Sequence, residues 1–307
     1  MSDRIAYFDC FSGASGDMLL GSLLDAGLNF EQLKADLERL NLSGYELEMT
    51  RQLRHGIRGI KFDVHVEGNE RPARNLQAVQ EIIGESDLPA EVIEQSLQVF
   101  RNLAGAEAKI HGMSVDEVHF HEVGAVDTLV DIVGFCCAVH RLGIEKLYAS
   151  ALRVGKGTVR IEHGLVPVPA PATLALLASA DAPVVSSEGE GEMVTPTGAA
   201  LLTTLATFSQ PPMRVQDVGY GFGTKEFPWA NVVRIWIGET IEESEIPLNH
   251  EHHHVHGDSH EHTHGHVHGD DEIGHDHVHE HDTSAHDRHS HSLHAHEHGQ
   301  EKLENDR

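Results

Sequence analysis

The segment from Asp9 to Asp17 carries the first group of residues that could do chemistry. It reads Asp-Cys-Phe-Ser-Gly-Ala-Ser-Gly-Asp, which combines two carboxylates with hydroxyl groups and glycines. A small-residue turn between a strand and a helix directs backbone N–H groups at an anion, and the helix dipole adds partial positive charge there. The spacing matches neither the P-loop nor the dinucleotide fingerprint. A plain turn in which Ser15 or Asp17 caps the helix fits equally well.

In the functional interpretation of this loop, Asp9 and Asp17 hold a divalent cation against a phosphate. Asp9 ends a predicted strand, and the carboxyl ends of strands are where α/β sheets bind ligands. The candidate catalytic residues here are Asp9, Ser12 and Asp17, and the candidate substrate-binding residues are Gly13, Ser15 and Gly16.

A second group combines imidazoles with carboxylates at metal-ligand spacing. His119 and His121 share a face if the chain is extended, whereas Asp127 and Asp131 share a face if it is helical. A strand-like entry into a helix would bring both pairs together with Glu122, and such ligands suit nickel, zinc or iron. The alternative is an acidic helix start with solvated histidines. Asp131 interrupts an apolar run, so we expect it near the core with a partner.

A third group lies in the glycine- and glutamate-rich stretch 188–198, which we expect to be flexible before a helix begins. Glu192 is a candidate ligand or base, and Thr195, Thr197 and Gly198 form a second candidate anion-binding helix start. The alternative is that Thr195 or Thr197 serves only as an N-cap.

The C-terminal stretch has a composition of its own. Of the 27 histidines in the chain, 20 lie between His250 and His298, where no Phe, Tyr or Trp occurs. Alternating imidazoles and acids give many overlapping sites for nickel, zinc or copper. Candidate ligands are His252, His254, His262, His264, His266, His268, His277 and His279. With so few apolar residues, we expect 250–307 to be a disordered metal-binding tail.

Residues 1–249 must supply the elements that position these groups. The spacing of apolar residues predicts strands at 5–9, 147–154, 158–161, 213–218 and 232–238, and a hairpin of 45–54 with 57–67. It predicts helices at 18–26, 30–40, 76–83, 89–110, 171–179 and 198–207, and a mostly helical stretch at 118–142. The segment 68–75 is the best candidate for an internal boundary. Strands and helices interleave, so we predict an α/β or α+β fold in which helices flank a mixed sheet.

Charge and cysteine content exclude several classes of protein. The formal net charge of −27 argues against nucleic-acid binding, which needs a basic face. Three cysteines cannot make a disulfide framework, the opening Met-Ser-Asp-Arg-Ile has no basic region followed by an apolar one, and no apolar stretch reaches ~20 residues. We therefore expect a cytoplasmic protein that does not contact a membrane, and we expect it to be a homo-oligomer.

Four motifs carry a resemblance to a known family. They are Ala-Tyr-Phe-Asp-Cys-Phe-Ser-Gly-Ala-Ser-Gly-Asp-Met from Ala6, Glu-Val-His-Phe-His-Glu-Val-Gly-Ala-Val-Asp from Glu117, His-Gly-Leu-Val-Pro-Val-Pro-Ala-Pro-Ala-Thr from His163, and Gly-Glu-Met-Val-Thr-Pro-Thr-Gly-Ala-Ala-Leu-Leu from Gly191. In this order they resemble the LarC family of nickel insertion proteins over residues 6 to about 240.

The resemblance implies a nickel chelatase, or cyclometallase, of the lyase class. Such a protein places Ni²⁺ into pyridinium-3,5-bisthiocarboxylic acid mononucleotide and consumes CTP, with a divalent cation such as Mg²⁺ or Mn²⁺, to make the nickel-pincer cofactor. Apo-lactate racemase or a related enzyme would receive it. Family members continue into a C-terminal domain to which CTP binding is attributed, and nothing after Gly238 resembles that domain. We therefore expect a separately encoded or frameshifted CTP-binding partner chain. A non-catalytic nickel store or metallochaperone is the main alternative, and a metal-dependent phosphohydrolase is a weaker one.

Overall fold

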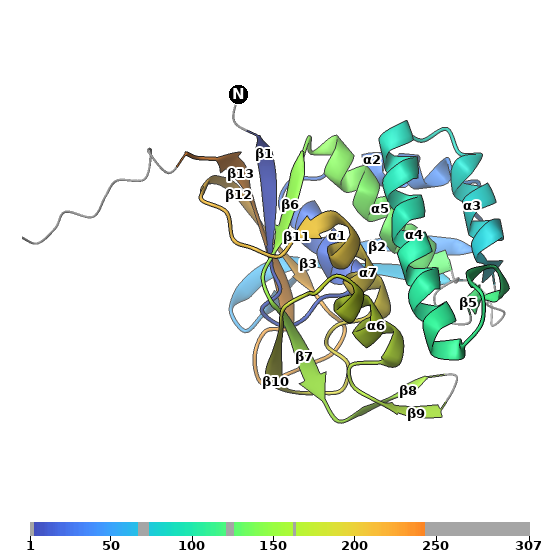
Figure 1. Ribbon diagram of the computed structural model, residues 1–307. Helices are drawn as coiled ribbons and strands as arrows, with labels where there is room; N and C mark the ends of the chain where they lie inside the picture. Colours follow the sequence, from blue (N-terminus) through green and yellow to red (C-terminus); the bar gives the residue numbers. More distant parts are fainter. Residues whose placement is uncertain (1–2, 67–73, 121–125, 162–163, 243–307) are drawn as a thin grey trace, which may run out of the picture. The chain divides into compact units, whose positions relative to one another are not determined.

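The computed structural model describes residues 3–66, 74–120, 126–161 and 164–242 (Figure 1). These all belong to one compact unit, Met1–Asn249. Its strands are β1 Arg4–Asp9, β2 Tyr45–Arg54, β3 Ile57–Val66, β4 Arg74–Asn75, β5 His119–Phe120, β6 Lys146–Ala149, β7 Leu152–Lys156, β8 Thr158–Ile161, β9 Gly164–Pro167, β10 Val184–Glu190, β11 Ala206–Thr207, β12 Met213–Phe222 and β13 Val232–Thr240. Its α-helices are α1 Gly16–Asp25, α2 Phe30–Glu38, α3 Leu76–Gly84, α4 Ala90–His111, α5 Val126–Arg141, α6 Pro171–Ser179 and α7 Pro196–Leu205.

The main sheet is mixed and has seven strands in the order β11-β6-β1-β13-β12-β3-β2. Strand β1 lies near its centre, parallel to β6 and antiparallel to β13, so that Asp9 stands opposite Arg234. The predicted hairpin of β2 and β3 forms one edge, with Arg54 paired to Ile57 around the turn. This arrangement places the carboxyl end of β1, where the Asp9–Asp17 loop begins, in the middle of the sheet.

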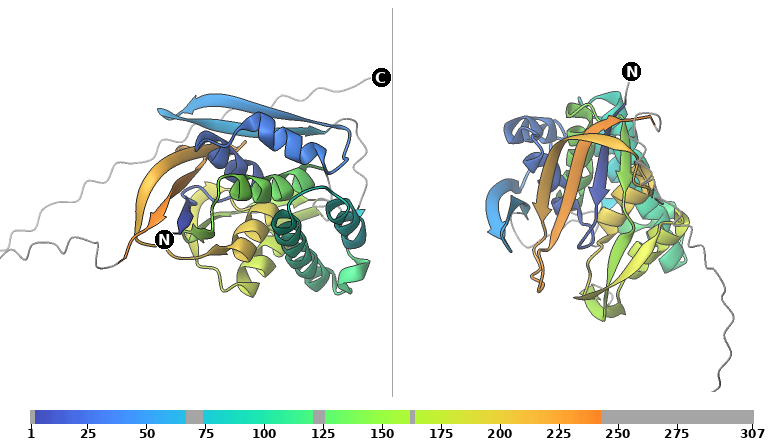
Figure 2. Two further views of the ribbon diagram at one scale, coloured as in Figure 1. Left: turned by 90° about the horizontal axis from the view of Figure 1, so that it is seen from above. Right: turned by 90° about the vertical axis from the view of Figure 1, so that its left-hand side faces the viewer.

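The described helices lie together on one side of the sheet (Figures 1 and 2). Helix α1 packs directly on β12 and β3 and is covered in turn by α5, which also contacts α2, α4 and α7. Helix α5 buries nearly all its residues from Val126 to Val139, as expected of a helix that is apolar on every side. One hydrophobic core includes residues from both sides of the 68–75 segment.

The predicted class, a mixed sheet with flanking helices, is confirmed, and two local predictions are wrong. The expected strand 147–154 is two strands, because the chain leaves the main sheet at Ser150 and β7 pairs with β10 instead. Residues 188–190 were expected to be flexible but belong to β10, parallel to β7. The stretch 118–142, predicted to be mostly helical, contains α5 from Val126 to Arg141, and His119 and Phe120 form a short strand with Arg74 and Asn75 before it.

No helix in the described part of the chain is both long enough and apolar enough to span a membrane. The predictions for 68–73 and for the tail fall outside the described residues.

Candidate functional site

The loop before α1 and the loop before α7 form hydrogen bonds with each other through their backbones. The N–H of Ala14 donates to the carbonyl oxygen of Met193 at 3.0 Å, and the N–H of Thr195 donates to the carbonyl oxygen of Ala14 at 3.0 Å. This short parallel bridge joins the start of α1 to the start of α7, although about 180 residues separate them in the sequence. The first and third candidate groups therefore belong to one site.

Two of the candidate glycines make this approach possible. Gly13 has a φ of 88°, and a Cβ there would lie 2.1 Å from the carbonyl oxygen of Met193. A Cβ on Gly198 would lie 2.3 Å from the carbonyl oxygen of Ala14. Real side chains cannot adopt such contacts without moving the backbone. These glycines are thus needed to bring the loops together.

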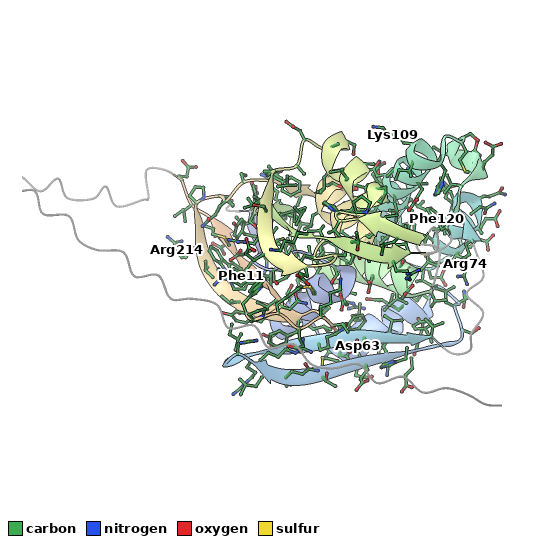
Figure 3. All side chains as sticks on the ribbon, turned by 90° about the horizontal axis from the view of Figure 1, so that it is seen from below. Phe11, Asp63, Arg74, Lys109, Phe120 and Arg214 are labelled. Atoms are coloured by element: carbon green, nitrogen blue, oxygen red, sulfur yellow. The ribbon has the colours of Figure 1, made fainter. Side chains whose placement is uncertain are left out.

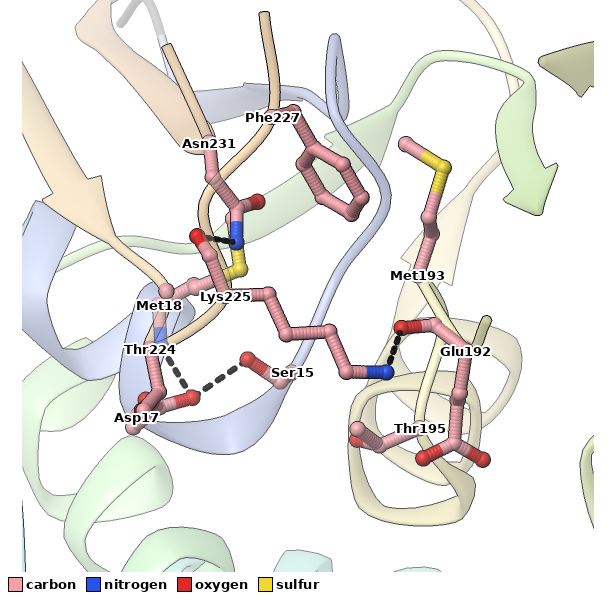
Figure 4. A pocket seen from close by; sticks show the side chains of 11 residues that line it. Ser15, Asp17, Met18, Glu192, Met193, Thr195, Thr224, Lys225, Phe227 and Asn231 are labelled. Carbon is pink, nitrogen blue, oxygen red and sulfur yellow. Dashed lines mark hydrogen bonds between the residues drawn. The ribbon is translucent and has the colours of Figure 1, made fainter. Parts of the chain in front are cut away.

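The loops form one wall each of a pocket, and the chain between β12 and β13 forms another (Figure 4). The cavity has a volume of about 150 Å³. Its lining residues are Ser15, Asp17, Met18, Glu192, Met193, Thr195, Gly223, Thr224, Lys225, Phe227 and Asn231. Four predicted site residues, Ser15, Asp17, Glu192 and Thr195, are therefore brought together in it.

Asp17 is fixed in this pocket by three donors. The Ser15 hydroxyl and the Met18 N–H both donate to its Oδ1, the latter at 2.9 Å. The Lys61 ammonium donates to its Oδ2 at 2.8 Å. Ser15 precedes α1, yet its hydroxyl makes no capping hydrogen bond to the helix. The Ser15 side chain thus orients a carboxylate, and simple capping is seen instead at Thr195, whose Oγ1 accepts from Gly198.

Lys61 is almost completely buried beneath the pocket, with 4% of its side chain exposed. Its ammonium also donates to Asp63 Oδ1 at 2.6 Å and to the Phe62 carbonyl oxygen at 2.8 Å. Burial acts to lower the pKa of Lys61, but the two carboxylates outweigh it and the net pKa is raised. The positively charged Lys61 ammonium group therefore stabilises the Asp17 carboxylate.

Asp131 of α5 brings the second candidate group close to the same place. A Cβ on Gly16 would lie 2.2 Å from Asp131 Oδ2, so the carboxyl group packs against the first residue of α1. Among the described residues its Oδ1 has no hydrogen-bond partner. Burial, followed by the charges of Asp17 and Asp127, raises the pKa of Asp131 well above its usual range. The partner expected for this buried oxygen is absent from the described part of the chain.

Other predicted residues lie away from the cavity. Asp9 accepts from Arg234 through Nε at 2.9 Å and through a second guanidinium nitrogen, which neutralises its charge. Ser12 is fully buried and accepts from the Trp229 indole at 3.1 Å. Thr197 is half-buried in the first turn of α7. The site roles predicted for these three residues remain predictions.

Much of the predicted metal site falls outside the described residues. His121, Glu122 and the tail histidines all lie there, and of His119 the structure describes the backbone, in β5 opposite Asn75. Within the described ranges, no group of three or more histidines, cysteines and acids is arranged to hold a metal ion. The assignment of His119, His121, Glu122, Asp127 and Asp131 as ligands is still a prediction.

Lys61 and the loop 223–231 belong to the site but are not predicted from the sequence. Lys61 lies between Ile60 and Phe62 in a hairpin strand, where alternation suggests a solvated lysine. In the structure this part of β3 is buried on both faces. The loop 223–231 matches no motif, although an aromatic pair, Phe227 and Trp229, beside Lys225 was a usable signal.

The raised pKa of Asp131 predicts a pH-dependent stability. The folded state keeps a proton that the unfolded chain releases above about pH 4, so the free energy of unfolding falls as pH rises past that value. In metal-free protein, Asp131→Asn removes this loss. Its melting temperature relative to the parent should therefore be higher at pH 8 than at pH 5. The exposed Asp116→Asn serves as control, and an Asp131→Asn difference that does not depend on pH would contradict the prediction.

Nickel insertion proteins are similar to this chain. A family model described as nickel insertion protein matches residues 6–267. A putative nickel insertion protein of Roseiflexus castenholzii is 49% identical over 243 residues, which cover 79% of this chain and 61% of the relative. A pyridinium-3,5-bisthiocarboxylic acid mononucleotide nickel insertion protein of Desulfitobacterium hafniense is 51% identical over 245 residues, with 79% and 60% covered. No solved structure matches significantly.

The chain spans about three fifths of the length of these curated relatives. The family model covers most of the chain, and the alignment with the Roseiflexus relative covers 79% of it. The resemblance recognised in the four sequence motifs is thereby confirmed, and the chain belongs to the nickel insertion protein family.

Proposed function

We propose that this chain carries out the insertion of Ni²⁺ into pyridinium-3,5-bisthiocarboxylic acid mononucleotide, the substrate in the name of the Desulfitobacterium relative. The observation that carries the proposal is the pocket in which the starts of α1 and α7 meet. Two helix N-termini favour an anionic group such as a phosphate. The carboxylates of Asp17 and Glu192 at the same pocket favour a cation.

The acidic side chains at the pocket and behind it support the binding of a metal ion at this place. Asp17, Asp127 and Asp131 are close enough for their charges to raise the pKa of Asp131. Like charges that lie close together at a partly buried site repel one another, and a bound cation would relieve that repulsion. His119, His121 and Glu122 would complete a nickel site with Asp127 and Asp131, and the carboxylate of Asp17 would connect that site to the substrate pocket.

The remaining parts of the proposal follow the family resemblance. CTP would be the co-substrate, with Mg²⁺ or Mn²⁺, and would bind to a C-terminal region or partner chain that corresponds to the part of the relatives beyond the match. The product would serve apo-lactate racemase or a related enzyme. The histidine-rich tail would collect nickel for the folded unit, because neutral imidazoles bind this metal well.

A nickel store or metallochaperone is the competing function, and the histidine content of the tail is what favours it. A chain truncated after Asn249 distinguishes the two functions. A store needs only the tail, whereas an insertase needs the pocket.

We expect the truncated chain to remain folded, because the tail has almost no apolar residues to contribute to a core. Equilibrium dialysis should show that it has lost most of its bound nickel. In an assay with apo-cofactor, CTP, partner chain and saturating nickel, it should insert nickel at a rate close to that of the full chain. Undiminished nickel binding would refute the role of the tail. Absence of insertion by both the full and the truncated chain would favour the store.

A further inference from the structure

The loop 223–231 is held rigidly against the pocket. The buried side chain of Asn231 donates to the Lys225 carbonyl oxygen at 3.0 Å, and the N–H of Gly223 donates to the Asn231 carbonyl oxygen at 3.0 Å. Arg54 from the hairpin donates to the Gly223 carbonyl oxygen at 2.6 Å. On the other side, Trp229 donates to Ser12. These hydrogen bonds fix the backbone of the loop, so that Lys225 and Phe227 start from defined positions beside the pocket.

Lys225 reaches from this loop across the pocket. Its ammonium donates to the Glu192 carbonyl oxygen at 2.7 Å and so links the loop to the start of α7 (Figure 4). In the described part of the chain no carboxylate forms an ion pair with Lys225, whereas Lys61, Lys146 and Lys156 are each paired. An uncharged carbonyl is a weaker acceptor for an ammonium group than a phosphate or carboxylate. An anionic ligand would therefore attract Lys225 away from Glu192.

Phe227 supplies the apolar part of the pocket. Its ring stacks on Trp229, with centroids 5.3 Å apart and planes 14° apart, and it lines the cavity. Half-buried and backed by the indole, this ring can accept a second planar group. A cationic aromatic ring is the best match, because the faces of Phe and Trp attract positive charge.

The cavity is smaller than a complete ligand requires. A volume of about 150 Å³ is below the roughly 300 Å³ needed for a complete small ligand. Lys225 crosses the cavity, so its movement toward a ligand would enlarge the available space.

We propose that Lys225 and Phe227 are the substrate-recognition residues of this pocket, in which Lys225 binds the phosphate of a pyridinium mononucleotide and Phe227 stacks on its ring. The inference rests on the proposed function for the identity of the substrate. Lys225 and Phe227 lie outside the four family motifs, and each would bind a different part of the ligand.

The chain provides its own reporter for a test. It has two tryptophans, Trp229 and Trp236. In a Trp236→Phe background, the fluorescence of Trp229 should be quenched when a pyridinium ring stacks on Phe227. Nicotinic acid mononucleotide is the probe, nicotinic acid riboside lacks the phosphate, and ribose 5-phosphate lacks the ring and is measured by competition. The full chain is used, with EDTA present so that nickel plays no part.

We expect Lys225→Ala to weaken the mononucleotide about tenfold or more, since it removes a charge-assisted hydrogen bond, and to change riboside affinity less than about twofold. Lys225→Arg should restore most of the mononucleotide affinity. Phe227→Leu should weaken both ring-containing probes about fivefold and leave ribose 5-phosphate unaffected. The matched control is Lys109→Ala, which removes an exposed lysine on α4 (Figure 3) and should change nothing.

Equal loss of riboside and mononucleotide on Lys225→Ala, or no loss of either, would overturn the inference, as would a parent chain that binds none of the probes. The nickel insertion assay is scored separately. A parent that inserts nickel while both variants keep its KM would leave the proposed function intact and remove this inference. A parent that shows the expected binding pattern but inserts no nickel would support this inference and contradict the proposed function.

Discussion

Replacement of Asp17 by Asn is expected to reduce nickel insertion by at least about 100-fold, the scale of loss typical for a carboxylate that acts directly on a reacting group. Asp17 lines the pocket and receives hydrogen bonds from Ser15, Met18 and Lys61, which keep it in one orientation. An amide at this position keeps the shape of the side chain but loses the negative charge. Binding of a cation, or of a cationic ring, should then be lost with it.

The structure offers a close control for this variant. Asp63 accepts from the same Lys61 ammonium, at 2.6 Å compared with 2.8 Å for Asp17, and the two side chains are 33% and 25% exposed. Asp63 lies on β3 (Figure 3) and does not line the pocket. Asp63→Asn should therefore cost similar stability, measured as melting temperature, but less than about threefold in the initial rate of insertion. Equal rates for the two variants would show that Asp17 matters only as a partner of Lys61.

The local part of the site could be predicted from the sequence. A strand, a small-residue turn and a helix follow one another within residues 4–25, so that Asp9, Ser15 and Asp17 were placed correctly at the end of β1 and the start of α1. The same holds for α7, where Pro196 and the N-cap Thr195 mark the helix start. Such signals depend on neighbours in the sequence, which is why they can be recognised without a structure.

The joining of the loops could not be predicted, because it depends on contacts between distant residues. The bridge between Ala14 and Val194 requires that β1, α1 and α7 are already placed by the sheet. Likewise, the ion pair of Asp9 with Arg234 results from the pairing of β1 with β13. Nothing near Asp9 in the sequence indicates that its charge is neutralised. Contacts of this kind decide which of several polar residues face the pocket.

The replacement of both His119 and His121 by Ala is expected to abolish insertion without unfolding the protein. These imidazoles precede α5, in which Asp127 lies in the first turn and Asp131 one turn later, beneath Gly16 and near Asp17. If they are ligands, their loss leaves carboxylates alone, which hold nickel less well than mixed imidazole and carboxylate sites. The assay supplies apo-cofactor, CTP and partner chain, and the product is measured by mass spectrometry.

The control for this double variant removes two other histidines. His65 and His140 are exposed and interact with Glu48 and Glu91 at the surface, so His65→Ala with His140→Ala should insert nickel normally. Surface changes usually alter stability by no more than about 0.5 kcal/mol, and both double variants should melt close to the parent. A His119 and His121 variant that is inactive but melts like the parent would support a metal site that joins α5 to the pocket. A variant that inserts nickel normally would remove these imidazoles from the site. One that no longer folds would show that they are structural and would leave Asp127 and Asp131 as the candidate ligands beside the pocket.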